Sequence, residues 1–241
     1  MGITLLAEAL RKAGHKVFVI APASNRSGVS HAISFFINPC KIVEIGEDTW
    51  SCEGTPVDCV VLGLKGGFCG PVYSPGQECP VDMILSGINK GANLGTDIVY
   101  SGTAAAARQG SLVNIPSVAL SLVENGGEWH WETAVEFVVE RLDEMAASWK
   151  PDSFVNVNMP NRPELPGALV HAFPSFRYYN DSIETYRAPD NCLYCFARAG
   201  DICTEPEHGS DREAVMGNNA SLSEVYIHPV LREFVLQKGE A

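Results

Sequence analysis

Apolar runs alternate with helix-like segments from residue 16 to residue 160, and this alternation limits the fold more than any other feature of the sequence. The strand-like runs are short and continuous, at 16–22, 81–87, 115–123 and 153–160. Segments with helical spacing of apolar residues lie between them, at 54–67, from about residue 103, and at 129–149. Continuous apolar strands joined through helices are typical of a parallel sheet buried on both faces. We therefore predict a Rossmann-like α/β sandwich of three layers with a mostly parallel sheet, which residues 1–160 form.

The alternation stops after residue 160. Residues 161–215 hold short β-like pieces between turns rich in Pro, Gly and Asp. This stretch also carries a set of aromatic side chains: Phe173, Phe176, Tyr178, Tyr179, Tyr186, Tyr194 and Phe196. Aromatic residues are enriched at protein contact surfaces, so we predict an extended β-hairpin arm that packs on a second subunit. Residues 216–241 are expected to return to the core as a strand and a short helix.

Composition narrows the classes of function. The net charge is −12 at pH 7, and a duplex of nucleic acid requires clustered Lys and Arg instead. No apolar run approaches the roughly 18 residues of a membrane span, and the first residues lack the pattern of a secretory leader. We therefore expect a cytoplasmic protein whose eight cysteines are mostly reduced. Cys192 and Cys195 form a C-x-x-C without a second pair at zinc-site spacing, so free thiols are favoured there.

Three polar loops follow predicted strands, and in an open α/β sheet ligands bind at the carboxyl ends of the strands. The first loop contains residues 25–28, the second contains Ser86 and Asn89, and the third opens a helix with Ser101, Gly102 and Thr103. Amides at a helix start form an anion site, and Asn and Ser oxygens suit Mg²⁺ or Mn²⁺. Each loop also has a plain structural interpretation, as an N-cap or a turn. Their convergence on one edge of the sheet favours a binding site.

Four segments together resemble the SurE survival-protein family, over nearly the whole chain. They are APASNRSGVSHAIS (21–34), GTPVDCVVLGL (54–64), DMILSGINKGANLGTDIVYSGTAAAARQG (82–110) and VNVNMP (155–160). The resemblance implies a metal-dependent phosphatase that hydrolyses nucleoside 5′-monophosphates, and 3′-monophosphates as a second option. It also implies a Rossmann-like fold whose C-terminal arm exchanges between subunits, giving a homodimer or homotetramer.

The resemblance assigns roles to individual residues. Ser27 and Asn89 match the serine and asparagine that bind the metal, and one Mg²⁺ or Mn²⁺ is expected in each subunit. The residues that match the phosphate pocket are Asn93, Ser101, Gly102 and Thr103.

The family also has a first strand followed by Asn-Asp-Asp-Gly, whose aspartates bind the metal. This sequence contains no pair of adjacent aspartates, so catalytic residues stay unassigned. Two interpretations remain open: a nucleotidase whose first strand lies upstream of Met1, and a non-catalytic paralogue that binds nucleotides or phosphate. The chain as printed is expected to hydrolyse nucleoside monophosphates barely above background.

Overall fold

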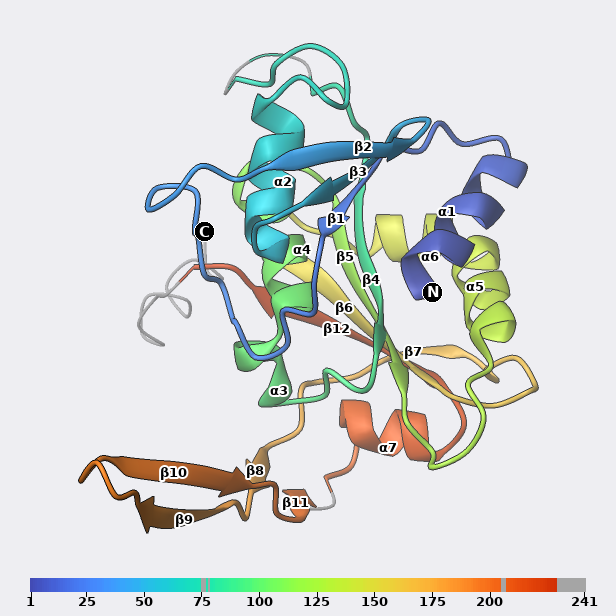
Figure 1. The fold of residues 1–241 in the computed structure, drawn as a ribbon. Coiled ribbons are helices and arrows are strands. Elements are labelled where there is room, and N and C mark those ends of the chain that lie inside the picture. Colours follow the sequence, from blue (N-terminus) through green and yellow to red (C-terminus); the bar gives the residue numbers. More distant parts are fainter. Residues whose placement is uncertain (75–76, 78, 205–206, 229–241) are drawn as a thin grey trace, which may run out of the picture.

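The computed structural model describes residues 1–74, 77, 79–204 and 207–228, and Figure 1 shows their arrangement. The helices are α1 (Gly2–Lys12), α2 (Pro56–Lys65), α3 (Asp97–Tyr100), α4 (Gly102–Leu112), α5 (Trp131–Glu140), α6 (Leu142–Ala147) and α7 (Asp211–Met216). The strands up to residue 160 are β1 (Val19–Pro22), β2 (Ile42–Gly46), β3 (Thr49–Cys52), β4 (Ile84–Lys90), β5 (Ser117–Val123) and β6 (Ser153–Pro160). The later strands are β7 (Leu169–His171), β8 (Arg177–Tyr179), β9 (Ser182–Arg187), β10 (Leu193–Arg198), β11 (Ile202–Thr204) and β12 (Ala220–Tyr226). Among the helices described, none is both long and apolar enough to cross a membrane.

The main sheet has the strand order β4-β5-β6-β12-β7. β4, β5 and β6 are parallel, β12 runs antiparallel to β6, and β7 is parallel to β12. Helices α1 and α5 cover one face, and α2 and α4 cover the other (Figure 1). Every residue of β6 is buried, as are the first six residues of β5. The predicted α/β sandwich with a Rossmann-like, mostly parallel sheet is therefore confirmed.

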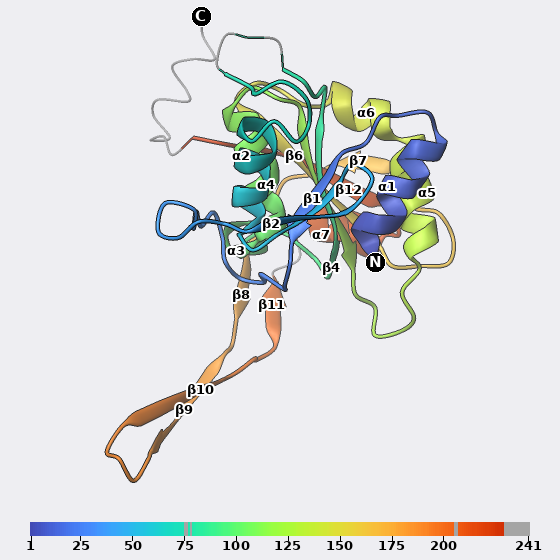
Figure 2. The same cartoon turned by 45° about the horizontal axis from the view of Figure 1, so that its top comes forward.

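A smaller sheet continues the same layer with the order β1-β3-β2. β1 is parallel to β3, and β2 is antiparallel to β3. Helix α2 packs on both β1 and α4, so one helical layer spans the two sheets. β1 and β4 lie side by side in both views (Figures 1 and 2), yet no ladder joins them within the described ranges. Each of these strands therefore presents an open edge to the other.

The single helix expected at 129–149 is divided in the structure. The backbone leaves helical geometry at Arg141, where φ is −108° and ψ is 12°. Asp143 and Glu144 then lie in the first turn of α6, where the positive end of the helix dipole favours acidic residues. The helix expected near the C-terminus falls at 229–241, outside the described residues, and helix α7 was not predicted.

The segment after residue 160 divides between the core and a projection. β7 joins the main sheet, whereas β8 pairs with β11 and β9 pairs with β10, both antiparallel. Figure 2 shows the β9–β10 hairpin extending away from the rest of the molecule. All residues of β9 and β10 are exposed. Because these residues are exposed, the hairpin lacks a packing partner within the described chain. A two-stranded hairpin without such a partner is only marginally stable in water.

Candidate functional site at the amino end of α4

Asn89 lies near the carboxyl end of β4, just after an irregularity in that strand. The register against β5 shifts between Ser86 and Asn89, and such an insertion re-aims the side chains that follow it. Gly87 permits the irregularity because its φ is 129°. A Cβ atom at this position would lie 2.3 Å from the carbonyl oxygen of Leu120. The local backbone of β4 therefore sets the direction in which the half-buried Asn89 side chain points.

Helix α4 can lie close to the sheet because its buried face consists of small residues. Residues 104–107 are four consecutive alanines, and all are buried. Further along, a Cβ atom on Gly110 would lie 2.2 Å from Oγ of Ser117 in β5. Alanine is also the strongest helix former, so this sequence supplies both the helix and its close approach to the strands.

The amino end of α4 meets the side chain of Asn89. Ser101 is the N-cap, and its Oγ accepts a hydrogen bond from the amide of Ala104 at 3.1 Å. Gly102 and Thr103 follow, and the first amides of a helix have no carbonyl partner within it. Oγ1 of Thr103 lies 3.5 Å from Oδ1 of Asn89. Amides, hydroxyls and an amide side chain thus gather at the positive end of a helix dipole, where an anion is favoured.

The loop that follows β1 reaches the chain just before α4. Ser30 donates from its amide to the carbonyl of Tyr100 at 3.0 Å and from its Oγ to the carbonyl of Val99 at 2.7 Å. Ser27 is exposed, and its Oγ donates to Oδ1 of Asn25 at 2.7 Å. The loop is therefore joined to the candidate site, whereas the described contacts of Ser27 are within its own loop. Its assignment as a metal ligand stays a prediction.

Asn93 lies in the loop that connects β4 to α3 and is 5% exposed. Its Nδ2 donates to Oγ of Ser121 at 2.7 Å, and its amide donates to Oδ1 of Asn158 at 2.8 Å. Its carbonyl accepts from the side chains of Asn156 and Asn158 at 2.9 and 3.1 Å. Asn93 therefore anchors the loop to β5 and β6. Its expected contact with phosphate stays a prediction.

Asp58 braces the same region from α2. It is fully buried and forms a capping box with Thr55. Its carboxylate accepts from the amide of Thr55 at 2.8 Å, and from the amide of Ser34 at 3.0 Å as well as from the Ser34 hydroxyl. Burial by itself raises the pKa of Asp58, but the hydrogen bonds from Ser34 and Thr55 outweigh it and hold that pKa below the ordinary value.

We expect the substitution Asp58→Ala to lower the free energy of unfolding by about 3 kcal/mol, because it leaves buried amides without a charged acceptor. Since the pKa is lowered in the folded state, the contribution is fully present above the unfolded pKa of about 3.9. It is lost as the pH falls through the folded pKa. Thermal unfolding of this variant and of the exposed control Asp82→Ala at pH 7 and pH 3 checks this. Equal melting temperatures for the two variants at pH 7 would contradict it.

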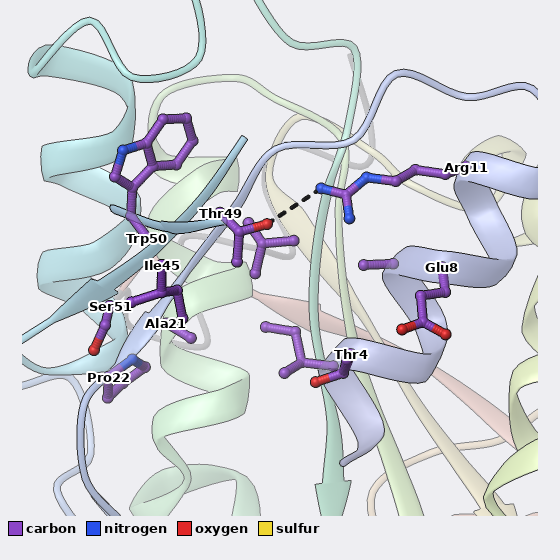
Figure 3. A pocket seen from close by; sticks show the side chains of 12 residues that line it. Thr4, Glu8, Arg11, Ala21, Pro22, Ile45, Thr49, Trp50 and Ser51 are labelled. Carbon is purple, nitrogen blue, oxygen red and sulfur yellow. Dashed lines mark hydrogen bonds between the residues drawn. The ribbon is translucent and has the colours of Figure 1, made fainter. Parts of the chain in front are cut away.

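A cavity of about 160 Å³ lies between α1 and the small sheet (Figure 3). Thr4, Glu8 and Arg11 line it from the helix, and Arg11 reaches Oγ1 of Thr49 at 3.4 Å. An engineered apolar cavity of similar size binds benzene, so this one has room for a large side chain. It lies beside the open edge of β1, and α1 also packs on β4.

The described side chains do not by themselves fit a divalent cation. Ser27 and Asn89 offer a hydroxyl and an amide oxygen, which are neutral, whereas Mg²⁺ in proteins is usually held through carboxylates. Within the described ranges, no group of three or more His, Cys, Asp or Glu side chains is placed to hold a metal ion. Tight binding at this site would need further anionic oxygens.

All eight cysteines are free thiols, and Cys192 and Cys195 are exposed on the projection.

Two buried carboxylates behind the site were not singled out from the sequence. Asp97 is the first residue of α3, and Asp211 is the first residue of α7, directly after its N-cap Ser210. Both are buried. An acidic residue at a helix start is a common surface pattern, so only its burial could have marked either residue as special.

The chain is similar in sequence and in fold to known proteins. The sequence model of the family described as "Survival protein SurE" matches residues 1–175. A protein named 5′-nucleotidase SurE from Xanthomonas campestris pv. campestris is 37% identical over 237 residues, which cover 94% of this chain and 85% of that relative. One of the same name from Stenotrophomonas maltophilia is 42% identical over 164 residues, 67% of this chain and 60% of the relative. The crystal structure of the SurE protein from Aquifex aeolicus matches this structure with a TM-score of 0.78 and 31% sequence identity. The matched region covers 98% of this chain and 92% of the Aquifex aeolicus chain.

Proposed function

The chain belongs to the SurE family of survival proteins, and we propose that it hydrolyses nucleoside 5′-monophosphates to nucleoside and phosphate. 3′-Monophosphates are proposed as second substrates. The relatives named 5′-nucleotidase support the nucleotidase class. The approach of Asn89 to Thr103 at the amino end of α4 carries the proposal for this chain, because it brings the oxygen and amide groups of two separate loops to one anion site.

The residues at this site suit a phosphate group. The free amides of Gly102 and Thr103 would donate to its oxygens, together with the hydroxyl groups of Ser101 and Thr103. Donors fixed in this way stabilise the charge that develops in the transition state without reorganising during the reaction. They also offset the net charge of −12, which repels an anionic substrate at long range. Asn89 is held beside them by β4 and would orient the phosphate from the other side.

Metal dependence is part of the proposal, with Ser27 and Asn89 facing one Mg²⁺ or Mn²⁺ in each subunit. A divalent ion would supply positive charge at the phosphoryl oxygen. Because the described donors are neutral, a non-catalytic protein that binds nucleotides or phosphate remains the second candidate. Eight free thiols agree with a reducing compartment such as the cytoplasm.

Phosphate release from AMP and GMP, measured with Mn²⁺, with Mg²⁺ and with EDTA, tests the two candidates. Release that requires the ion and stops with EDTA supports the nucleotidase. Binding of AMP without release of phosphate supports the second candidate if release stays absent when two carboxylates are added beside Asn89. A chain that neither binds nor hydrolyses either nucleotide contradicts both.

We further propose that the β9–β10 hairpin packs on a second copy of the chain, giving a dimer or a tetramer. The aromatic side chains of Tyr186, Tyr194 and Phe196 are 60%, 50% and 57% exposed. Such exposure is unfavourable for a hairpin that stays alone in water.

Replacing Tyr186, Tyr194 and Phe196 together by Ser should shift the protein to a monomer, because the contact loses its apolar area. Light scattering at micromolar concentration measures the mass. The control is Phe36→Ser, which removes an aromatic ring that is 82% exposed outside the hairpin. A wild-type monomer, or an oligomer that survives the triple substitution, would contradict the proposal.

A further inference from the structure

A buried ion pair joins the base of the projecting arm to the loop that leads into α4. Arg177 opens β8, and its Nη1 donates to a carboxylate oxygen of Asp97 at the start of α3. The hydroxyl of Tyr179, at the end of β8, donates to the other oxygen of Asp97. Arg177 is 7% exposed and Asp97 is 9% exposed. The partners are 80 residues apart in the sequence, so the pair connects two distant parts of the chain.

The residues just before Asp97 are held by the same elements. The amide of Gly95 donates to Oδ2 of the buried Asp211 at 2.7 Å, and Asp211 begins α7. Oγ1 of Thr96 accepts from the backbone amide of Arg177 at 3.0 Å. The backbones approach so closely that a Cβ atom on Gly95 would lie 1.8 Å from the carbonyl oxygen of Ser175. Three consecutive residues are therefore fixed by the arm and by α7.

Asp97 passes this constraint directly to the candidate phosphate site. Its carbonyl accepts from the amide of Ser101 at 3.1 Å, at the end of the single turn of α3. Ser101 is the N-cap of α4, so its position decides where the free amides of Gly102 and Thr103 point. Removing one member of a buried ion pair leaves the other charge without compensation. Asp97 is sensitive to this loss because its side chain is buried away from solvent.

We propose that Arg177 is a positioning residue for the phosphate site, acting through Asp97 on the first turn of α4, with Tyr179 and Asp211 in support. The proposal rests on the proposed function, since it concerns the same site. In this proposal the arm has two roles, because it contacts a second subunit and also positions the phosphate site. A partner subunit that packs on the arm would contact the segment that contains β8, and could change the position of Arg177 and therefore of the phosphate site.

The test compares Arg177→Met with Arg177→Lys, which keeps the charge, and with the control Arg198→Met. Arg198 pairs with Glu184 at 2.9 Å in the exposed shaft of the arm, so its loss removes an ion pair without touching the core. Hydrogen exchange of the amides at 97–104 is followed in each full-length variant. Arg177→Met should accelerate this exchange by about tenfold, while amides in β5 and β6 keep their rates. Arg177→Lys should recover most of the protection, and Arg198→Met should match the wild type.

Affinity for inorganic phosphate gives the second readout. The dissociation constant should rise by about tenfold in Arg177→Met, a size typical of coupling between sites. Wild-type exchange at 97–104 in a folded Arg177→Met variant would overturn the proposal. If that variant does not fold, Tyr179→Phe removes only the phenol contact with Asp97, and unchanged exchange there would overturn it equally. Exchange requires no ligand, so a wild-type protein that fails to bind phosphate refutes the proposed function and leaves the positioning test intact.

Discussion

Phosphate release from AMP should rise by about a hundredfold, and should come to require Mn²⁺ or Mg²⁺, when two carboxylates are supplied beside Asn89. The structure shows where they have to be attached. A Cβ atom on Gly2 would lie 2.6 Å from the carbonyl oxygen of Ile88, so the start of α1 lies against β4 next to Asn89. Residues fused directly before Met1 would therefore begin within reach of the site.

The fused segment we propose is a short apolar strand followed by Asn-Asp-Asp. β1 and β4 present open edges to each other, and helices lie on both faces of that layer. A strand between them would be buried on both faces, as the parallel strands of such sheets are. Run parallel to β4, it would end at the edge where Asn89 lies, and its two aspartates would add the anionic oxygens that Ser27 and Asn89 lack.

The matched control is the same extension ending in Asn-Asn-Asn, which keeps the strand and removes the charges. We expect it to stabilise the fold without raising phosphate release, whereas the acidic version becomes active and loses its activity with EDTA. Equal, ion-dependent rates for the unextended chain and the acidic version would mean that the chain draws its ligands from elsewhere. Our assignment of Ser27 and Asn89 to the metal would then be wrong.

The second large effect is expected from Thr103→Val and Asn89→Ala in the acidic extended form. Each removes one polar group at the amino end of α4 and leaves the buried face of the helix unchanged. Loss of one preorganised group at such a site lowers the turnover rate by roughly a hundredfold to a thousandfold. Stability should change little in Thr103→Val, since the contact between the two side chains is a long 3.5 Å. Asn89→Ala should cost about 1 kcal/mol, because it also removes the hydrogen bond from Nδ2 of Asn89 to the carbonyl of Gly91 at 3.0 Å.

Thr133→Val is the control for Thr103→Val. Thr133 is also half-buried near the start of a helix, and its hydroxyl donates to the carbonyl of Pro163 at 3.2 Å. It lies in α5 on the opposite face of the sheet. We expect its substitution to leave turnover of AMP at the wild-type rate. A Thr103→Val variant that retains full turnover would remove the amino end of α4 from the site.

Local sequence patterns were enough to predict most of the core. Continuous apolar runs predicted β1, β4, β5 and β6, and the structure has a strand within or overlapping each predicted range. Thr55, Pro56 and Asp58 carry the signals of a helix start, and α2 begins at Pro56. These patterns are reliable because they report burial on one or both faces over a few residues.

Contacts between distant residues could not be predicted in the same way. The resemblance assigned Asn93 to the phosphate pocket, and only the folded chain shows its hydrogen bonds with Asn156 and Asn158 in β6. The pair of Arg177 and Asp97 joins a strand of the arm to a loop of the core. Neither the spacing of apolar residues nor the adjacent residues in the sequence indicate that these two side chains meet. The sheet is also divided between β1 and β4. This division depends on which strands pair at their edges, and the spacing of residues along the chain does not specify that pairing.

A crystal structure of the protein soaked with AMP would locate the phosphate, and its position decides whether the amino end of α4 is the site. We expect phosphate oxygens about 2.7–3.1 Å from the amide nitrogens of Gly102 and Thr103, with the side chain of Asn89 facing the same group. A phosphate bound elsewhere, for example in the cavity between α1 and the small sheet, with the start of α4 left free, would contradict it.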